Sequence, residues 1–284
     1  MLGGGRHDAG IQAFTRYAPG MLAPMLVVSV GNTRTRFARV EDGKLEPSRV
    51  VDNADAAAGA TIIDAASGPG GALPVLMASV NDPEADRLER VLEAAGSRVS
   101  RFVRDVPIPI QNTLDDDSTV GQDRLLDALG AFARSQQACI VVDAGTAVTV
   151  DFVDGQGVFH GGAIAPGATM MLRAMHEQTA ALPKVQLSPE TLPGSDAPFG
   201  KTTAQAMALG AASAVRGLVH TLIDRYAEFY GAYPRVVATG GDAALLFEND
   251  ELVEHIVPDL TLVGMVAAAE AIDKADEHDE DDDA

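Results

Sequence analysis

Two glycine turns with similar local sequences carry the residues best suited to phosphate chemistry. Residues 27–37 read VVSVGNTRTRF and residues 141–152 read VVDAGTAVTVDF, so Gly31 aligns with Gly145, 114 residues further on. A tight glycine turn between two strands exposes backbone N–H groups and a threonine hydroxyl, which can bind a phosphate. A pair of ordinary hairpin turns is the alternative. Because a third glycine turn, ATGG at 238–241, accompanies the pair, we predict a nucleotide site.

Asp123 is the candidate for proton transfer. It lies in the segment VGQDR (120–124), at the start of a predicted helix that directly precedes the second turn. A carboxylate in such a place can accept a hydroxyl proton while phosphate is transferred to that oxygen. Arg124 beside it can bind an acidic substrate or steady a phosphate. The alternatives are compensation of the helix dipole by Asp123 and a surface salt bridge for Arg124.

The elements that must position these residues alternate between extended and helical patterns. Strands are predicted over 25–32, 34–40, 73–80, 98–104, 139–145, 147–154 and 235–241, with a turn at 42–43. Helices are predicted over 83–96, 120–135, 168–179, 202–230 and from 243. This pattern indicates an α/β fold in which β-hairpins are mixed with parallel crossovers. A single duplication at so long an offset predicts two similar lobes rather than a repeat array.

Composition narrows the class of protein. The chain has 284 residues, enough for two domains, and a formal net charge of −20 without a basic stripe, which disfavours nucleic-acid binding. We predict no membrane span and no secretory signal, and therefore a cytoplasmic protein. The acidic cluster 115–117 is more typical of a solvated loop than of a metal site. Residues 1–24 and the acidic tail 273–284 are expected to be disordered.

An ordered set of short motifs resembles the type III pantothenate kinase family. The motifs are GNT at 31–33, VGQDR at 120–124, VDAGTAVTVD at 142–151, GGAIAPG at 161–167, LPKV at 182–185, GKTTAQAM at 200–207 and ATGG at 238–241. The resemblance implies two duplicated lobes of the actin type, which are also ribonuclease H-like, with an ATP cleft between them. We assign the lobes to residues 25–117 and 118–272. The resemblance also implies ATP-dependent phosphorylation of pantothenate to 4′-phosphopantothenate, the first step of coenzyme A biosynthesis. The enzyme it implies is a homodimer that needs Mg²⁺ and a monovalent cation (K⁺ or NH₄⁺).

The family's functional residues transfer to matching positions of this chain. Asp123 matches the catalytic base, and Asp143 matches the ligand of the monovalent cation. The substrate-binding residues implied are Gly121, Gln122, Asp123, Arg124 and Thr203, where Thr202 leaves the register open by one. The ATP-binding residues implied are Ser29, Val30, Gly31, Asn32, Thr33, Arg34, Thr35, Arg36, Thr146, Gly240 and Gly241.

Two positions depart from the family's pattern. Ser29 stands where the family usually has an aspartate that helps to organise the metal and phosphates, and Leu114 stands where a tyrosine is common. Two alternatives therefore stay open beside the pantothenate kinase. One is a non-catalytic regulator that binds nucleotide without turnover, and the other is a kinase for another small hydroxy compound.

Overall fold

The computed structural model describes residues 22–68, 70–193 and 197–282, with side chains as far as residue 275. Its strands are β1 (Met25–Val30), β2 (Arg34–Glu41), β3 (Lys44–Leu45), β4 (Arg49–Asp52), β5 (Ser67–Gly68), β6 (Gly71–Ala72), β7 (Val75–Ser79), β8 (Val99–Arg101), β9 (Cys139–Ala144), β10 (Ala147–Val153), β11 (Phe159–Pro166), β12 (Arg235–Thr239) and β13 (His255–Ile256). Its helices are α2 (Ala58–Ala66), α3 (Asp82–Ala94), α4 (Gln122–Ser135), α5 (Ala168–Glu177), α6 (Thr203–Tyr230), α7 (Ala243–Phe247) and α8 (Leu260–Asp282).

The chain forms two compact units. The first contains residues up to Gln111, Asp116–Arg134 and the chain from Asp259 onward, and the second contains Asn112–Asp115 and Ser135–Pro258.

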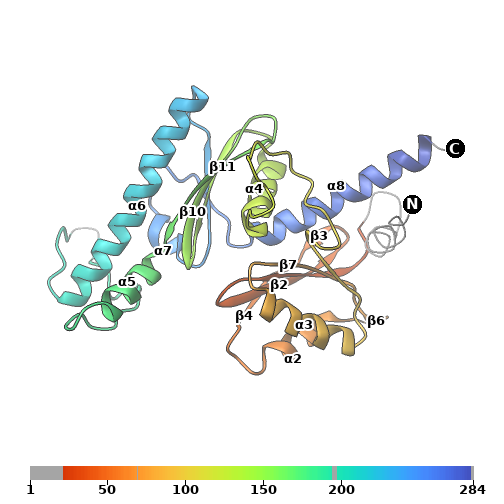
Figure 1. Cartoon of the computed structure of the whole chain (residues 1–284), viewed down its shortest axis with the longest axis horizontal. Coiled ribbons are helices and arrows are strands. Elements are labelled where there is room, and N and C mark those ends of the chain that lie inside the picture. The colour runs from red at the N-terminus through yellow and green to blue at the C-terminus, as the bar shows by residue number, and fades with distance from the viewer. Residues whose placement is uncertain (1–21, 69, 194–196, 283–284) are drawn as a thin grey trace. The chain divides into compact units, whose positions relative to one another are not determined.

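The first unit is built on a sheet with the order β3-β2-β1-β7-β8, and β4 pairs with β2. Strand β1 is antiparallel to β2 and parallel to β7. Its sequence MLVVSV is almost continuously apolar because both faces of the strand are covered. Leu26, Val28 and Val30 pack against α2 and α3, whereas Met25 and Val27 pack against α4 and α8. Figure 1 shows α2 and α3 together beside this sheet.

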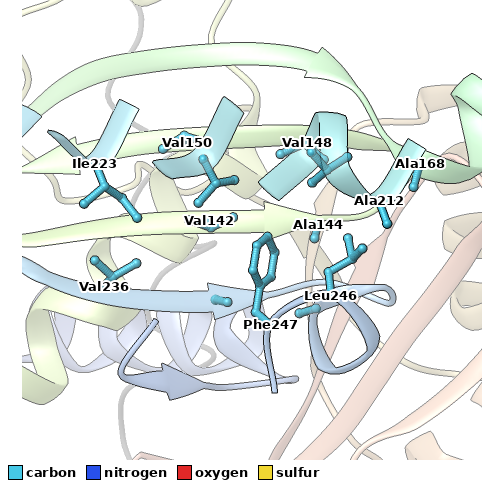
Figure 2. Close-up of a cluster of buried hydrophobic side chains, with 14 of the residues drawn as sticks. Val142, Ala144, Val148, Val150, Ala168, Ala212, Ile223, Val236, Leu246 and Phe247 are labelled. Atoms are coloured by element: carbon cyan, nitrogen blue, oxygen red, sulfur yellow. The ribbon is translucent and has the colours of Figure 1, made fainter. Parts of the chain in front are cut away.

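The second unit has a sheet with the order β11-β10-β9-β12-β13. Strand β9 is antiparallel to β10 and parallel to β12. Val142, Val150 and Val236 on one face of this sheet form a core with Ile223 of α6 and Phe247 of α7 (Figure 2). Strand β11 forms one edge of this sheet, and its Phe159 also makes an isolated bridge to Asn112.

The duplication predicted from the two turns is confirmed. Strands β1 and β9 each have six residues and the same sequence of burial, in which the fifth residue alone is half-buried. That residue is Ser29 in β1 and Asp143 in β9. Each strand pairs with an antiparallel partner that follows the glycine turn and with a parallel partner that comes later in the chain. Ser29 and Asp143 therefore occupy equivalent places in the two units.

The predicted lobe boundary between residues 117 and 118 differs from the units that the structure shows. Helices α4 and α8 belong to the first unit, because Leu126 of α4 and Met265 of α8 are fully buried in one core with Met25 of β1. The chain thus returns to the first unit twice.

The predicted disorder at the ends is also corrected where the structure describes them. Leu22 is 3% exposed and packs in the first core, and α8 continues through the acidic tail to Asp282, with Asp273 only 7% exposed. The alanine-rich sequence that leads into the tail favours helix. Residues 1–21 and 283–284 lie outside the described residues.

Helix α6 is the one helix in the described part of the chain that is long and apolar enough to cross a membrane. Its apolar character has a simpler cause. Met207, Ala211, Val215, Val219 and Ile223 recur at helical spacing and are buried in the core of the second unit. A single such helix is weak evidence for a membrane span.

Candidate active site

The first glycine turn joins β1 to β2 and is held by backbone contacts. The N–H of Gly31 donates to the carbonyl of Arg34 at 3.0 Å, and a Cβ at position 31 would lie 2.9 Å from that carbonyl oxygen. Asn53, the residue after β4, supports the turn, because its side-chain amide donates to the carbonyl of Gly31 at 2.8 Å and its backbone N–H donates to the carbonyl of Thr33. Glycine is therefore required at position 31, and the turn is rigidly supported.

The predicted ATP-binding residues of this turn fall into two groups. Asn32, Thr33 and Arg34 are exposed at its tip, where they are available to a ligand. Thr35 is buried and donates a hydrogen bond to Asn53, and Val30 is also buried.

Arg36 is half-buried and engaged within the protein. Its guanidinium lies 2.7 Å from the carboxylate of Asp259, which also accepts from the hydroxyl of Ser48 at 2.6 Å. The structure therefore places Arg36 in an ion pair, and Arg34 is the exposed cation of this turn.

Asp123 lies in the first turn of α4. Its Oδ1 accepts from the backbone N–H of Arg124 at 2.8 Å, and a Cβ at position 121 would lie 2.5 Å from that oxygen, so Gly121 makes room for the carboxylate. Burial raises the pKa of the Asp123 carboxyl, while its bonds to backbone N–H groups oppose that rise. A carboxylate with a raised pKa is a stronger base than an exposed aspartate.

Gln122 fixes the start of α4 against the sheet. Its side-chain oxygen accepts from the N–H of Ser79, at the end of β7, at 3.1 Å. Strand β7 lies beside β1, and Ala78 is paired with Ser29. The start of α4 and Ser29 are therefore near the same edge of the first sheet. Gln122, predicted to contact substrate, has a positioning contact through this oxygen.

The second glycine turn surrounds Asp143. Gly240, at the end of β12, has a φ of +95°, and a Cβ there would overlap the Asp143 carboxylate and the carbonyl of Ala144. Gly145 closes the turn between β9 and β10, with its N–H 3.0 Å from the carbonyl of Ala147. Gly167 donates to the carbonyl of Thr146 at 3.0 Å. Three glycine-containing segments thus meet next to one half-buried carboxylate, and predicted residues Asp143, Thr146 and Gly240 are brought together.

Sequence reasoning missed two residues next to this second turn as site residues, namely Gly167 and Asp242. Gly167 precedes α5, whose first turn has no side-chain cap, and such a helix start favours an anion. Asp242, after the exposed Gly241, donates its N–H to Ala144 at 2.9 Å, and its carboxylate lies 3.5 Å from the hydroxyl of Thr169. A glycine directly before a helix and an acid directly after a glycine pair were the available signals.

The two threonines before α6 differ in their contacts. The hydroxyl of Thr202 caps the helix by accepting from the N–H of Gln205 at 3.2 Å. Thr203 is the first residue of α6 and its side chain is exposed. Thr202 and Thr203 are both exposed, so the substrate contact predicted for Thr203 stays a prediction.

The donor set suits a hard cation that is shared with phosphates. Within the described ranges, no group of three or more His, Cys, Asp or Glu side chains could hold a metal by itself. Mg²⁺ in kinases is usually bound through one or two carboxylates together with substrate phosphates and water. Asp143 with its surrounding carbonyl groups offers oxygen ligands of this kind. The acidic cluster 115–117 is exposed, and Asp116 accepts two hydrogen bonds from Ser118, as in an ordinary solvated loop.

A cavity of about 520 Å³ in the second unit contains none of the predicted site residues. It is lined by aromatic side chains of β10 and α6, among them Phe152, Tyr226 and Phe229. The candidate site is therefore defined by the turns and by α4 rather than by this cavity.

Similarity to solved structures supports a two-lobed, actin-like fold. The structure is similar to a conserved putative Baf family transcriptional activator from Campylobacter jejuni, with a TM-score of 0.54, 18% identity, and coverage of 89% of this chain and 100% of that chain. It is also similar to MreB5 of Spiroplasma citri bound to ADP, with a TM-score of 0.50, 13% identity, and coverage of 89% and 98%. At these identities the likeness shows the fold alone.

Sequence comparison defines the family more narrowly. The family model described as type III pantothenate kinase matches residues 25–225, and the chain belongs to this family. A type III pantothenate kinase of Dehalococcoides mccartyi strain 195 is 36% identical over 193 residues, which are 67% of this chain and 72% of that protein. The relative from Akkermansia muciniphila is 42% identical over 151 residues, 53% of this chain. That match spans 60% of the length of the Akkermansia relative.

Proposed function

We propose that the chain phosphorylates pantothenate with ATP, giving 4′-phosphopantothenate, the first step of coenzyme A biosynthesis. The observation that carries the proposal is the half-buried Asp123 carboxylate with its raised pKa, at the start of α4 and at the sheet edge that carries the first glycine turn. Membership of the family supports the choice of substrate. The setting we propose is the cytoplasm.

Asp123 accepts the proton of the primary hydroxyl of pantothenate as that oxygen attacks the terminal phosphorus of ATP. The bond from this phosphorus to the bridging oxygen of ADP breaks, and ADP leaves. Gly121 leaves space for the Asp123 carboxylate, and Arg124 offers a positive charge to the carboxylate of the substrate. Thr203 is assigned to a substrate contact. Catalysis in such a site is mainly positioning and neutralisation of charge.

Each glycine turn is assigned to phosphate binding. In the first unit the exposed Asn32, Thr33 and Arg34 contact ATP, and in the second unit Thr146 and Gly240–Gly241 do so. Mg²⁺, when bound, neutralises charge on the phosphates, and a monovalent cation is held at Asp143. A local cation such as Arg34 is needed because the net charge of −20 repels ATP.

We further propose a homodimer in which α6 contributes to the contact. The outward face of α6 carries small residues at helical spacing, including Gly210, Ala214 and Gly217. Nothing lies within 4 Å of a Cβ built at Gly210 or Gly217, so another helix can approach this face closely. Light scattering on the whole chain measures the mass of the assembly directly, and a monomer at all concentrations would contradict the dimer.

The experiment that tests the reaction is incubation of the chain with ATP, Mg²⁺, K⁺ and pantothenate, followed by mass identification of the product. We expect pantothenate to gain one phosphoryl group, in equal amount to the ADP released. Phosphorylation of a different hydroxy compound in preference to pantothenate would contradict the substrate. ATP binding without any turnover would favour a regulator.

A further inference from the structure

The segment Asp259–Gly264, at the start of α8, lies well beyond the residues 25–225 that match the family model. We propose that this segment is a brace that fixes the helix bearing Asp123 relative to the first glycine turn, and that Asp259 and Thr261 are positioning residues for phosphoryl transfer. The inference rests on the proposed function for its kinetic consequence. Its structural consequence can be measured without turnover.

The first contact of the brace is with the strand that follows the glycine turn. Asp259 lies 2.7 Å from the guanidinium of Arg36 and accepts from Ser48 at 2.6 Å. Arg36 is paired with Ser29 across the β1–β2 ladder. The side chains of Arg36 and Asp259 are 27% and 28% exposed, so this ion pair is shielded more than a surface pair. Residue 29 is a serine and offers Arg36 no carboxylate, whereas Asp259 supplies the carboxylate of the ion pair with Arg36.

The second contact is with α4 itself. The hydroxyl of Thr261 donates to Oδ1 of Asp127 at 2.7 Å, and Asp127 is only 2% exposed. Asp127 lies one helical turn after Asp123, so a bond at Asp127 restricts the rotation of the turn that carries Asp123. Removal of a donor to a buried carboxylate costs more than the loss of an exposed hydrogen bond. The Thr261–Asp127 hydrogen bond therefore strongly favours one orientation of α4.

The third contact brings two helix backbones together. A Cβ at Gly264 would overlap the carbonyl oxygen of Leu126, and a Cβ at Gly130 would lie 2.8 Å from both the N–H nitrogen of Gly264 and the carbonyl oxygen of Leu260. With glycine on both sides, α4 and α8 cross at direct backbone contact. At such a distance the helices cannot slide without a clash.

The start of α4 is held separately by the bond from Ser79 to Gln122. Asp123 thus lies between an anchor on β7 and the brace on α8. The same short segment also holds Arg36 on β2. A change in the brace should displace Asp123 by a fraction of an ångström while the sheet stays intact. Reactions that depend on alignment of a base are sensitive to such displacements.

The decisive variant is Thr261→Val, which keeps the shape of the side chain and removes the hydroxyl. We expect kcat for pantothenate phosphorylation to fall about 10- to 100-fold, with little change in the KM for ATP. Thr261→Ser, which restores the hydroxyl, should recover kcat to within a few-fold. Thr61→Val is the matched control, because Thr61 lies on α2 and its hydroxyl donates to the carbonyl of Ala57, four residues earlier, at 3.1 Å.

The second readout is the pKa of Asp123, measured by carbon NMR of the carboxyl group in the full chain without substrates. We expect Thr261→Val to change this pKa, Thr261→Ser to restore it, and Thr61→Val to leave it unchanged. Wild-type protein without turnover would contradict the proposed function, while the NMR comparison would still test the brace.

The brace is overturned if Thr261→Val keeps both kcat and the Asp123 pKa at wild-type values. It is also overturned if kcat falls only in proportion to the fraction of unfolded protein. Should Thr261→Val fail to fold, Asp259→Asn provides the test, since it loses the charge of a partly exposed group. We then expect a lower kcat, and an unchanged kcat would count against the proposal.

Discussion

At the scale of single residues, the two units differ at one chemically important place. Ser29 and Asp143 have the same position in equivalent strands, the same degree of burial and the same kinds of neighbouring strands. Only the second unit has a carboxylate there. A carboxylate adds a negative charge that strengthens the binding of a divalent cation, whereas a serine hydroxyl carries no charge.

The first prediction is that Ser29→Asp lowers the Mg²⁺ concentration needed for half-maximal activity. In the parent, activity should still rise at millimolar Mg²⁺. A Mg²⁺ titration at saturating ATP and pantothenate measures both curves, and Ser29→Asn is the control of equal size without the charge. Coincident Mg²⁺ titration curves for the parent and Ser29→Asp would show that residue 29 does not contribute to Mg²⁺ binding.

The second prediction concerns the stability contributed by Asp123. Because burial raises its folded-state pKa, the folded protein binds a proton more tightly than the unfolded chain does. The free energy of unfolding should therefore fall as pH rises from the unfolded carboxyl pKa, about 3.9, through the raised folded value. Asp123→Asn has no carboxyl group at this position, so this loss of stability with rising pH should be absent from the variant.

The measurement is urea denaturation of both proteins between pH 4 and pH 8. Asp123→Asn should be more stable than the parent at neutral pH, and the difference should shrink towards acidic pH. A variant that is less stable at pH 7 would contradict the burial account.

The local patterns of the candidate site could be predicted from the sequence, but the contacts between distant residues could not. Glycine turns and an acid at a helix start are local patterns, and the structure shows them where they were predicted. Arg36 was expected to attract ATP, yet it is paired with Asp259, which lies 223 positions away in the sequence. Thr35 was likewise expected to bind ATP, and its hydroxyl donates a hydrogen bond to the side chain of Asn53. Contacts between distant segments have no local signal.

At the scale of elements, the long periodic segments were predicted well. The helices expected at 83–96 and 202–230 correspond to α3 (Asp82–Ala94) and α6 (Thr203–Tyr230). The helix α2 (Ala58–Ala66) and the strand β11 (Phe159–Pro166) were missed. Strand β11 contains consecutive glycines, which are unusual within a strand, and it lies at the edge of its sheet. Its sequence therefore resembles a loop more than a strand.

The third prediction is that Gly240→Ala destabilises the second unit by about 1–3 kcal/mol and weakens ATP binding. Alanine is strained at the φ of +95°, and its Cβ would overlap Asp143 and Ala144. Thermal unfolding and ATP titration measure the two effects. Gly59→Ala is the control, because its Cβ would meet only side-chain atoms at 3.5 Å or more. Equal behaviour of the two variants would contradict the tight packing at Gly240.

At the scale of the whole molecule, the order of elements along the chain does not coincide with the units. The prediction of two duplicated lobes was correct, and the boundary was not, because α4 and α8 pack on the first sheet. Apolar residues on a helix show that one face is buried but not which sheet buries it. The start of α8 was missed for a related reason, since the acidic tail beyond it dominated the composition.

The fourth prediction compares two shortened chains. Residues 25–272 should melt several degrees lower than residues 22–282. The shorter chain lacks Leu22, whose burial contributes about 1.5–3 kcal/mol, and Asp273 with the last turns of α8. Calorimetry of both proteins measures the difference. Identical melting temperatures would show that neither end stabilises the first unit.

The most direct test of the account is turnover by the parent and by Asp123→Asn, with the product identified by mass and ATP binding measured on the same samples. We predict that the parent forms 4′-phosphopantothenate and that Asp123→Asn binds ATP normally but turns over about 10²- to 10⁴-fold more slowly. Near-normal formation of 4′-phosphopantothenate by Asp123→Asn would contradict the assignment of Asp123 as the base. A parent that binds ATP but forms no phosphorylated pantothenate at any Mg²⁺ concentration would contradict the proposed function itself.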